Sequence, residues 1–226
     1  MKLFRPLVLA AAALLTLAAG PAPRANWNAT IAVTPEGGYR LGNPNAPVKV
    51  IEHSSYTCPH CAQFEIEGSD RMRLGFIAGG KVSFEVRHYV RDPVDLTVAL
   101  LATCGPPSKF FLNHTAFLRS QSRWIQPLTT MSEAQKKRWF TGDDVTRRRA
   151  IASDFHLYEI AATRGIDRLA ADRCIADQAK ARQFAEITAE GDRIGVTGTP
   201  SFQINGQLLV ATYEWSLLEP QISAAL

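Results

Sequence analysis

The spacing of apolar and polar residues changes several times along this chain. Residues 48–54 form a short β-rich run without regular alternation, which is typical of a strand buried on both faces. Residues 59–78 then carry apolar positions at helical spacing until Gly79 and Gly80 end the pattern. Residues 81–90 alternate strictly, as in a strand. A strand–helix–strand unit of this length predicts two parallel strands.

The next hundred residues predict helices and no strand. We expect an all-helical region over residues 93–194, with apolar stripes at helical spacing in residues 110–117, 151–162 and 184–194. Residues 26–47, which precede the first strand, are rich in proline and glycine. They leave room for at most one short strand near residues 39–41.

Strand character returns near the end of the chain. Two short apolar runs, residues 202–204 and 208–210, flank Asn205 and Gly206, and an Asn-Gly pair in this position is a strong signal for a β-hairpin. A final short helix is expected from about Ser216.

The order of these elements predicts an α/β fold in which a helical insertion interrupts a sheet domain. We place the sheet domain at residues 26–92 and 195–226, and the helical insertion domain at residues 93–194.

The first 25 residues differ from the rest. Lys2 and Arg5 precede an apolar run at residues 7–19, and small residues and prolines follow it. This pattern is typical of a secretory signal peptide, and the run is shorter than the ~20 apolar residues of a membrane span. We therefore expect residues 1–25 to direct export to an oxidising compartment, the periplasm.

Composition supports a folded domain and argues against a nucleic-acid partner. Of the 226 residues, 46% are hydrophobic and 20% charged, which suits a chain with a core of its own. The 25 basic residues are interleaved with 21 acidic ones. The only dense basic run is Arg147, Arg148 and Arg149, which we expect on a solvated helix face.

The chemistry of the chain centres on Cys58, Pro59, His60 and Cys61, which lie between a buried strand and the start of a helix. Unpaired N–H groups and the dipole at a helix N-terminus favour a thiolate at Cys58. Pro59 suits the first helical turn, because a donor there would have no partner. His60 adds a positive charge when protonated, and Cys61 is one turn away, within reach for a reducible disulfide.

A thiolate favoured in this way makes the pair a good disulfide donor. We expect Cys58 to be the exposed sulfur that a substrate attacks, and Cys61 to be buried. The alternative from another class is a copper-binding module that uses both thiols. Zinc is disfavoured because there is no second Cys-x-x-Cys pair. We expect no metal and no cofactor.

The two remaining cysteines, Cys104 and Cys174, stand alone in the helical region. They are either buried free thiols or a disulfide between two helices. An exported chain favours the disulfide, and its role would be stability.

Residues 50–61, which end in the Cys-Pro-His-Cys motif, resemble the active-site segment of the DsbA family of thiol–disulfide oxidoreductases. Residues 195–202 resemble that family's second conserved segment. The resemblance covers essentially all of the chain after the signal peptide. It implies a thioredoxin-like fold with an inserted helical domain.

The same resemblance implies roles for three further residues. Pro200 would be cis and opposite the cysteines, and the backbone of Thr199 would pair with the main chain of a substrate. Glu52 would be a buried acid below the cysteines that relays a proton to Cys61. A surface carboxylate at a strand end is the alternative for Glu52, and an ordinary trans turn is the alternative for Pro200.

One feature departs from the best-known oxidases of the family, which have valine before the cis-proline. Thr199 resembles the isomerases and reducing relatives instead, so a disulfide isomerase or reductase is the alternative to a dithiol oxidase. The isomerases are usually oligomers through an N-terminal extension, and residues 26–47 are too short for one. We expect a monomer that acts on newly exported proteins with free cysteines and is reoxidised by a membrane partner resembling DsbB.

Overall fold

The computed structural model of the chain describes residues 25–226. The expected signal peptide therefore lies, except for its last residue, outside the described residues. None of the helices in the described part is long and apolar enough to span a membrane.

Six strands form one mixed sheet in the order β1-β2-β4-β3-β5-β6. The strands are β1 (Ile31–Val33), β2 (Tyr39–Gly42), β3 (Val48–Ser54), β4 (Val82–His88), β5 (Ser201–Ile204) and β6 (Gln207–Leu208). β3 and β4 are parallel neighbours, as predicted, and every other pair is antiparallel. The hairpin of β5 and β6 also forms as predicted, with Asn205 and Gly206 both at positive φ.

The expectation of at most one strand in residues 26–47 is wrong. β1 pairs with β2 across a tight turn in which the Thr34 amide donates to the Gly38 carbonyl at 2.8 Å. A strand of three residues is too short to show a recognisable alternation of apolar and polar residues. The sequence therefore gives no signal for β1, which forms by pairing with β2.

The predicted helix over residues 59–78 is interrupted. It consists of α1 (Pro59–Glu67), α2 (Ser69–Arg71) and a π-helical turn (Met72–Ile77). Gly68 stands at the break, and a side chain there would come within 2.7 Å of the Trp215 ring. The missing side chain thus allows the last helix, α12 (Trp215–Ala224), to pack against α1.

Residues 93–194 are helical without a strand, as predicted. They form α3 (Pro93–Ala102), α4 (Phe110–Arg119), α5 (Gln121–Trp124), α6 (Pro127–Thr130), α7 (Glu133–Lys136), α8 (Asp144–Asp154), α9 (Leu157–Thr163), α10 (Arg168–Ile175) and α11 (Gln178–Arg193). Short 3₁₀ turns lie before α4 and after α7. The stripe expected over residues 151–162 is divided between α8 and α9, because His156 adopts a left-handed conformation between them. Ala162 is consequently exposed.

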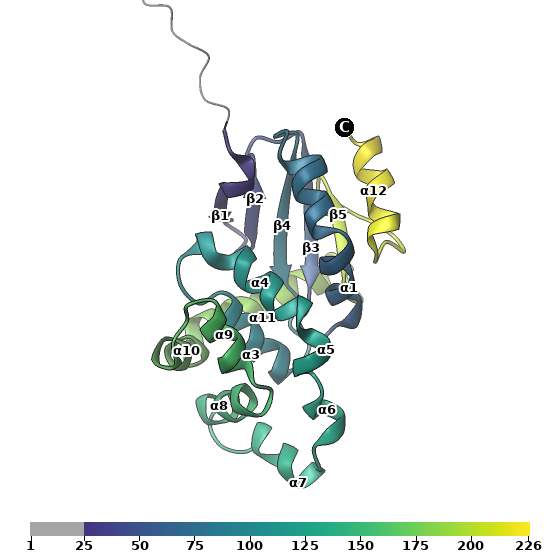
Figure 1. The fold of residues 1–226 in the computed structure, drawn as a ribbon. Helices are drawn as coiled ribbons and strands as arrows, with labels where there is room; N and C mark the ends of the chain where they lie inside the picture. Colours follow the sequence, from purple (N-terminus) through teal and green to yellow (C-terminus); the bar gives the residue numbers. More distant parts are fainter. Residues whose placement is uncertain (1–24) are drawn as a thin grey trace, which may run out of the picture.

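Figure 1 shows the sheet at one end of the molecule, with β3 and β4 pointing toward the helices gathered at the other end. On one face of the sheet, Phe64 of α1 packs against Phe84 and Phe202. On the other face, Gly191 of α11 lies against the Tyr89 ring.

Two apolar clusters make up the core. One lies between the sheet and helices α1 and α12, and the other fills the helical region. Tyr56, Cys58, Cys61 and Ala62 belong to the second cluster, although they follow a strand of the sheet. The cysteine motif thus lies where the sheet meets the helical region. The division of the chain into domains at residues 92 and 195 remains a prediction.

The expectation that residues 147–149 form a solvated helix face is wrong for Arg148. This side chain is buried and donates to the Ile175 carbonyl at 3.1 Å. Arg147 pairs with Asp144 on the same helix. The basic run therefore contributes to packing between α8 and α10 through its middle residue.

Candidate active site

The cysteine motif begins where α1 begins. Cys58 has extended backbone angles and is the N-cap of α1, and its carbonyl accepts the Ala62 amide at 3.3 Å. Pro59 occupies the first turn, as predicted, where a missing N–H costs nothing. The unpaired amides of this turn and the helix dipole stabilise negative charge at Cys58.

The loop before β5 lies directly opposite Cys58. The Thr199–Pro200 peptide bond is cis, as the resemblance implied. The Cys58 Sγ donates to the Thr199 carbonyl at 2.9 Å. Residues 58 and 199 are far apart in the sequence, and the pairing of β3 with β5 brings them together.

The expectation that Cys58 is exposed is wrong in this structure. Its residue is 2% exposed, against 0% for Cys61, while Pro59 and His60 beside it are exposed. The Thr199 carbonyl covers the sulfur from the opposite loop. Cys61 is buried, as predicted.

The pKa values of the two thiols are shifted in opposite directions. The pKa of Cys58 is lowered to about 5, chiefly because the Cys61 thiol can donate a hydrogen bond to the Cys58 thiolate. Burial raises the pKa of Cys61 well above its usual value, and its interaction with Cys58 adds to that rise. Cys58 is thus the thiolate of the pair.

Thr199 also favours the thiolate at Cys58, because a hydrogen bond from its side chain lowers the pKa of Cys58. In the thiol form, the Thr199 hydroxyl is buried and bonds to none of the described residues. Loss of the Cys58 proton removes the bond to the Thr199 carbonyl and leaves the sulfur free to accept from this hydroxyl.

Glu52 of β3 is a buried acid, as the resemblance implied, and not a surface carboxylate. It is 1% exposed, and none of the described residues donates to its Oε1. The pKa of Glu52 is raised to about 8, chiefly because of burial, and negative charge on Cys58 contributes to the rise. Glu52 in turn raises the pKa of Cys61.

A cavity of about 470 Å³ opens beside the cysteines. Its walls are His60, the loop of residues 197–201 and the segment of residues 208–213 that follows the hairpin. The His60 ring lies 6.1 Å from the Tyr213 ring across this space, and Val210 is 90% exposed. Both polar and apolar groups line this cavity.

Several residues hold the active-site loop that sequence reasoning did not identify. Asp95 of α3 accepts from the Tyr56 amide at 2.7 Å, and Asp92 accepts from the Thr57 hydroxyl at 2.6 Å. Gln121 of α5 donates to the carbonyls of Tyr56 and Cys58 at 2.6 and 2.8 Å.

Only Asp92 has a local signal that could have drawn attention to it. It is an N-cap followed by proline, and its side chain accepts from the amides of Val94 and Asp95. Nothing near Gln121 in the sequence indicates a contact with residues more than sixty positions away.

The second cysteine pair forms the disulfide that an exported chain favours. Cys104 and Cys174 are linked, with their Cα atoms 5.7 Å apart and 70 positions apart in the sequence. The bond joins the ends of α3 and α10 and is separate from Cys58 and Cys61, which are unlinked. Within residues 25–226, no group of three or more His, Cys, Asp or Glu side chains is arranged to bind a metal ion.

Comparisons with known proteins agree with this fold and site. The family described as thioredoxin matches residues 34–224. The crystal structure of a protein-disulfide isomerase from Novosphingobium aromaticivorans is 52% identical, with a TM-score of 0.79, and the match covers 82% of this chain and 95% of that one. Wolbachia pipientis alpha-DsbA1 has the same fold, with 22% identity, a TM-score of 0.66, and coverage of 83% and 90%.

Curated relatives match over a shorter segment. A Rickettsia bellii relative named as a protein-disulfide oxidoreductase is 32% identical over 85 residues, which is 37% of this chain and 33% of the relative. The matched part thus spans about a third of that relative's length.

The chain therefore belongs to the thioredoxin family. Its fold is DsbA-like, with a helical region inserted between β4 and β5. The resemblance of residues 50–61 and 195–202 to the DsbA family is thereby confirmed.

Proposed function

We propose that this chain is a dithiol oxidase that donates the Cys58–Cys61 disulfide to newly exported proteins. The observation that carries the proposal is the opposite shift of the two thiols, with the pKa of Cys58 lowered to about 5 and that of Cys61 raised. A stabilised thiolate makes the reduced pair the favoured product, so the disulfide is given away readily.

The exchange proceeds in two displacements. A substrate thiolate attacks Cys58 Sγ, a substrate–Cys58 disulfide forms, and the Cys58–Cys61 bond breaks to leave a thiolate at Cys61. Because the pKa of Cys61 is high, this thiolate takes up a proton. A second substrate thiolate then attacks the substrate sulfur and releases Cys58 as a thiolate. Two substrate thiols are oxidised and the enzyme pair is reduced by two electrons.

Glu52 is suited to supply the proton that Cys61 takes up. Its pKa of about 8 keeps it largely protonated near neutral pH, and its charge interacts with that of Cys61. We therefore assign Glu52 the relay role and Thr199 a main-chain contact with the substrate. We expect an unfolded substrate chain to bind in the cavity beside His60.

The pair must be reoxidised after each turnover. We propose a membrane partner resembling DsbB for this step, a periplasmic location, and action as a monomer. A donor that binds substrates by main-chain contacts suits an environment of many unrelated unfolded chains.

The test is the equilibrium of the pair with glutathione. The protein is held in buffers of varied glutathione ratio, its thiols are alkylated, and the mass shift gives the reduced fraction. We expect the Cys58–Cys61 disulfide to oxidise glutathione, and a reduced, unfolded protein to gain disulfides when mixed with it. A pair that glutathione disulfide oxidises completely even in a strongly reducing buffer contradicts the oxidase direction.

A disulfide isomerase is the second candidate, and two observations favour it. Thr199 precedes the cis-proline, and the solved structure that is 52% identical is named a protein-disulfide isomerase. The distinguishing substrate is a protein with scrambled disulfides. A reduced isomerase reshuffles the wrong disulfides of this substrate and so restores the substrate's activity. An oxidase of this kind, in its disulfide form, acts only on a substrate whose cysteines are reduced.

A further inference from the structure

The active-site loop, residues 55–57, is held by a network in which the Ser55 and Thr57 hydroxyls each have an acceptor and a donor. The Ser55 hydroxyl donates to Asp95 Oδ2 at 2.6 Å, and the Thr57 hydroxyl donates to Asp92 Oδ2 at 2.6 Å. Both hydroxyls accept from one guanidinium, since Arg91 Nε lies 3.0 Å from Ser55 Oγ and Arg91 Nη2 lies 3.2 Å from Thr57 Oγ1.

The same loop contacts both cysteines through its backbone, the sulfur of Cys61 and the amide of Cys58. The Ser55 amide donates to Cys61 Sγ at 3.5 Å, and the Cys58 amide donates to the Ser55 carbonyl at 3.3 Å. The Arg91 amide is itself held by Asp95 Oδ2 at 3.0 Å. Arg91 and the cysteines are therefore linked through a few short hydrogen bonds.

We propose that Arg91 is a positioning residue of the cysteine pair: its two-pronged guanidinium holds the loop of residues 55–57 through Ser55 and Thr57 and keeps a positive charge near Cys58. The inference deepens the proposed exchange at Cys58 and rests on that site being the reactive one. An arginine suits this role because its planar fork presents two parallel donors.

Hydrogen bonds and charges from several neighbouring elements act on the pKa of Cys58, so the contribution of Arg91 must be separated from theirs. Cys61 of α1 and Thr199 of the opposite loop stabilise the thiolate by hydrogen bonds, and Arg91 does so by its charge. Glu52 of β3 interacts with Cys58 unfavourably when both are ionised. Arg91 itself is exposed, so solvent screens its charge and its effect is moderate.

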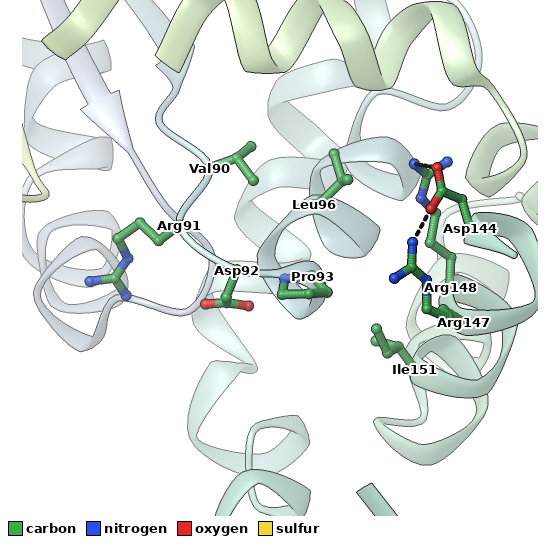
Figure 2. A pocket seen from close by; sticks show the side chains of 9 residues that line it. All are labelled: Val90, Arg91, Asp92, Pro93, Leu96, Asp144, Arg147, Arg148 and Ile151. Atoms are coloured by element: carbon green, nitrogen blue, oxygen red, sulfur yellow. Dashed lines mark hydrogen bonds and ion pairs between the residues drawn. The ribbon is translucent and has the colours of Figure 1, made fainter. Parts of the chain in front are cut away.

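The chain offers a matched control on the facing wall of a cavity of about 300 Å³. Figure 2 shows the Arg91 side chain directed away from this cavity, while Arg147 and Arg148 lie with Asp144 on the other wall. Arg147 pairs with Asp144. Within residues 25–226, no hydrogen bond joins Arg147 to the loop of residues 55–57.

The experiment compares Arg91→Gln, Arg91→Lys and Arg147→Gln with the parent protein. The pKa of Cys58 is read from thiolate absorbance and from the pH dependence of alkylation, and the pair is equilibrated with glutathione. Circular dichroism and melting confirm that each variant is folded. We expect Arg91→Gln to raise the pKa of Cys58 by about half a unit, because one nearby opposite charge is lost.

The accompanying changes follow from that shift. A rise of half a unit in the pKa of Cys58 lowers the equilibrium constant for oxidising glutathione about threefold. Arg91→Lys keeps the charge and is expected to return at least half of the shift, and Arg147→Gln is expected to match the parent. A folded Arg91→Gln variant whose Cys58 pKa equals that of the parent overturns the inference, even if it melts earlier, since a merely structural role predicts only that.

Failure of this inference is distinguishable from failure of the proposed function. The pKa of Cys58 is measured on the protein alone and does not depend on the direction of exchange in the cell. A reducing pair in the parent protein contradicts the oxidase, and an unchanged Cys58 pKa in Arg91→Gln contradicts the role of Arg91.

Discussion

Cys58 and Cys61 are the same residue type three positions apart, yet their surroundings give them opposite acid strengths. Cys58 caps the helix and can accept hydrogen bonds from Cys61 and Thr199, which stabilise its thiolate. Cys61 is fully buried one turn further along, where its own ionisation is opposed by burial and by Glu52. The division of roles in exchange therefore follows from which of the two stands at the helix start.

Glu52 allows a prediction about pH and stability. An acid whose pKa is about 8 in the folded chain and near 4.5 when unfolded binds its proton more tightly when folded. The stability it contributes is complete below pH 4.5 and is lost as the pH rises toward 8. Glutamine cannot ionise, so the Glu52→Gln variant does not lose this stability. The unfolding free energy of the variant minus that of the parent should therefore increase by on the order of 1–3 kcal/mol from pH 5 to pH 8.

The measurement is denaturant unfolding at several pH values. Both proteins carry Cys58→Ser and Cys61→Ser, so that neither thiol titrates. Glu67→Gln, which changes an exposed carboxylate on α1, is the matched control and should show a difference that is constant with pH. A constant difference for Glu52→Gln as well would mean that Glu52 is ionised normally in the folded chain.

Among the elements, α3 and α5 determine how the active-site loop is held. The first turn of α3 supplies Asp95, and the start of α5 supplies Gln121. Both helices belong to the inserted region, whereas the loop follows β3 of the sheet. The insertion is thus part of the active-site framework as well as a cover.

Gln121 allows a prediction at this scale. Gln121→Ala leaves the carbonyls of Tyr56 and Cys58 without their side-chain donor in a buried setting. We expect it to lower the unfolding free energy by about 1–3 kcal/mol, because unpaired buried polar groups are costly. Chemical denaturation measures this change.

Gln126→Ala is the control for this change. The Gln126 side chain donates to the Ser122 carbonyl at an exposed position, so its loss should cost no more than about 0.5 kcal/mol. Equal stability losses for the two variants would show that the contacts of Gln121 with the loop do not stabilise the fold.

At the scale of the whole molecule, two apolar cores meet at the cysteine pair, and one disulfide ties the inserted region together. The Cys104–Cys174 bond closes a loop of about 70 residues between α3 and α10. Closing a loop of that length restricts the unfolded chain and stabilises the folded one.

Removing this disulfide should weaken the fold and leave the reactive pair nearly unchanged. Cys104→Ser with Cys174→Ser is expected to lower the unfolding free energy by about 2–4 kcal/mol, measured in denaturant. The glutathione equilibrium of Cys58–Cys61 should stay within about twofold of the parent, because Cys104 follows the C-terminal end of α3 whereas Asp95, which contacts the active-site loop, lies in its first turn. A larger change in that equilibrium would show that the second disulfide adjusts the reactive one.

Much of the fold could be predicted because its signals are local. The strand at residues 48–54, the alternating strand after Gly80, the Asn-Gly hairpin and the position of Cys58 at a helix start all depend on neighbours in the sequence. The short β1, the break at Gly68 and the left-handed His156 could not be predicted in the same way. Each depends on a partner element: β2, the Trp215 ring, or the packing that separates α8 from α9.

The sequence by itself determined the chemistry of this protein: a Cys-Pro-His-Cys motif at a helix N-terminus, an acid six residues before it, and a Thr-Pro segment before the last strands. The tertiary structure decided how that chemistry is held. The pairing of β3 with β5 places Thr199 on Cys58, the inserted helices bring Gln121 and Asp95 to the loop, and Arg91 reaches it from the segment between β4 and α3. Such contacts join residues tens of positions apart, and no local pattern of hydrophobic and polar residues encodes which of them will meet.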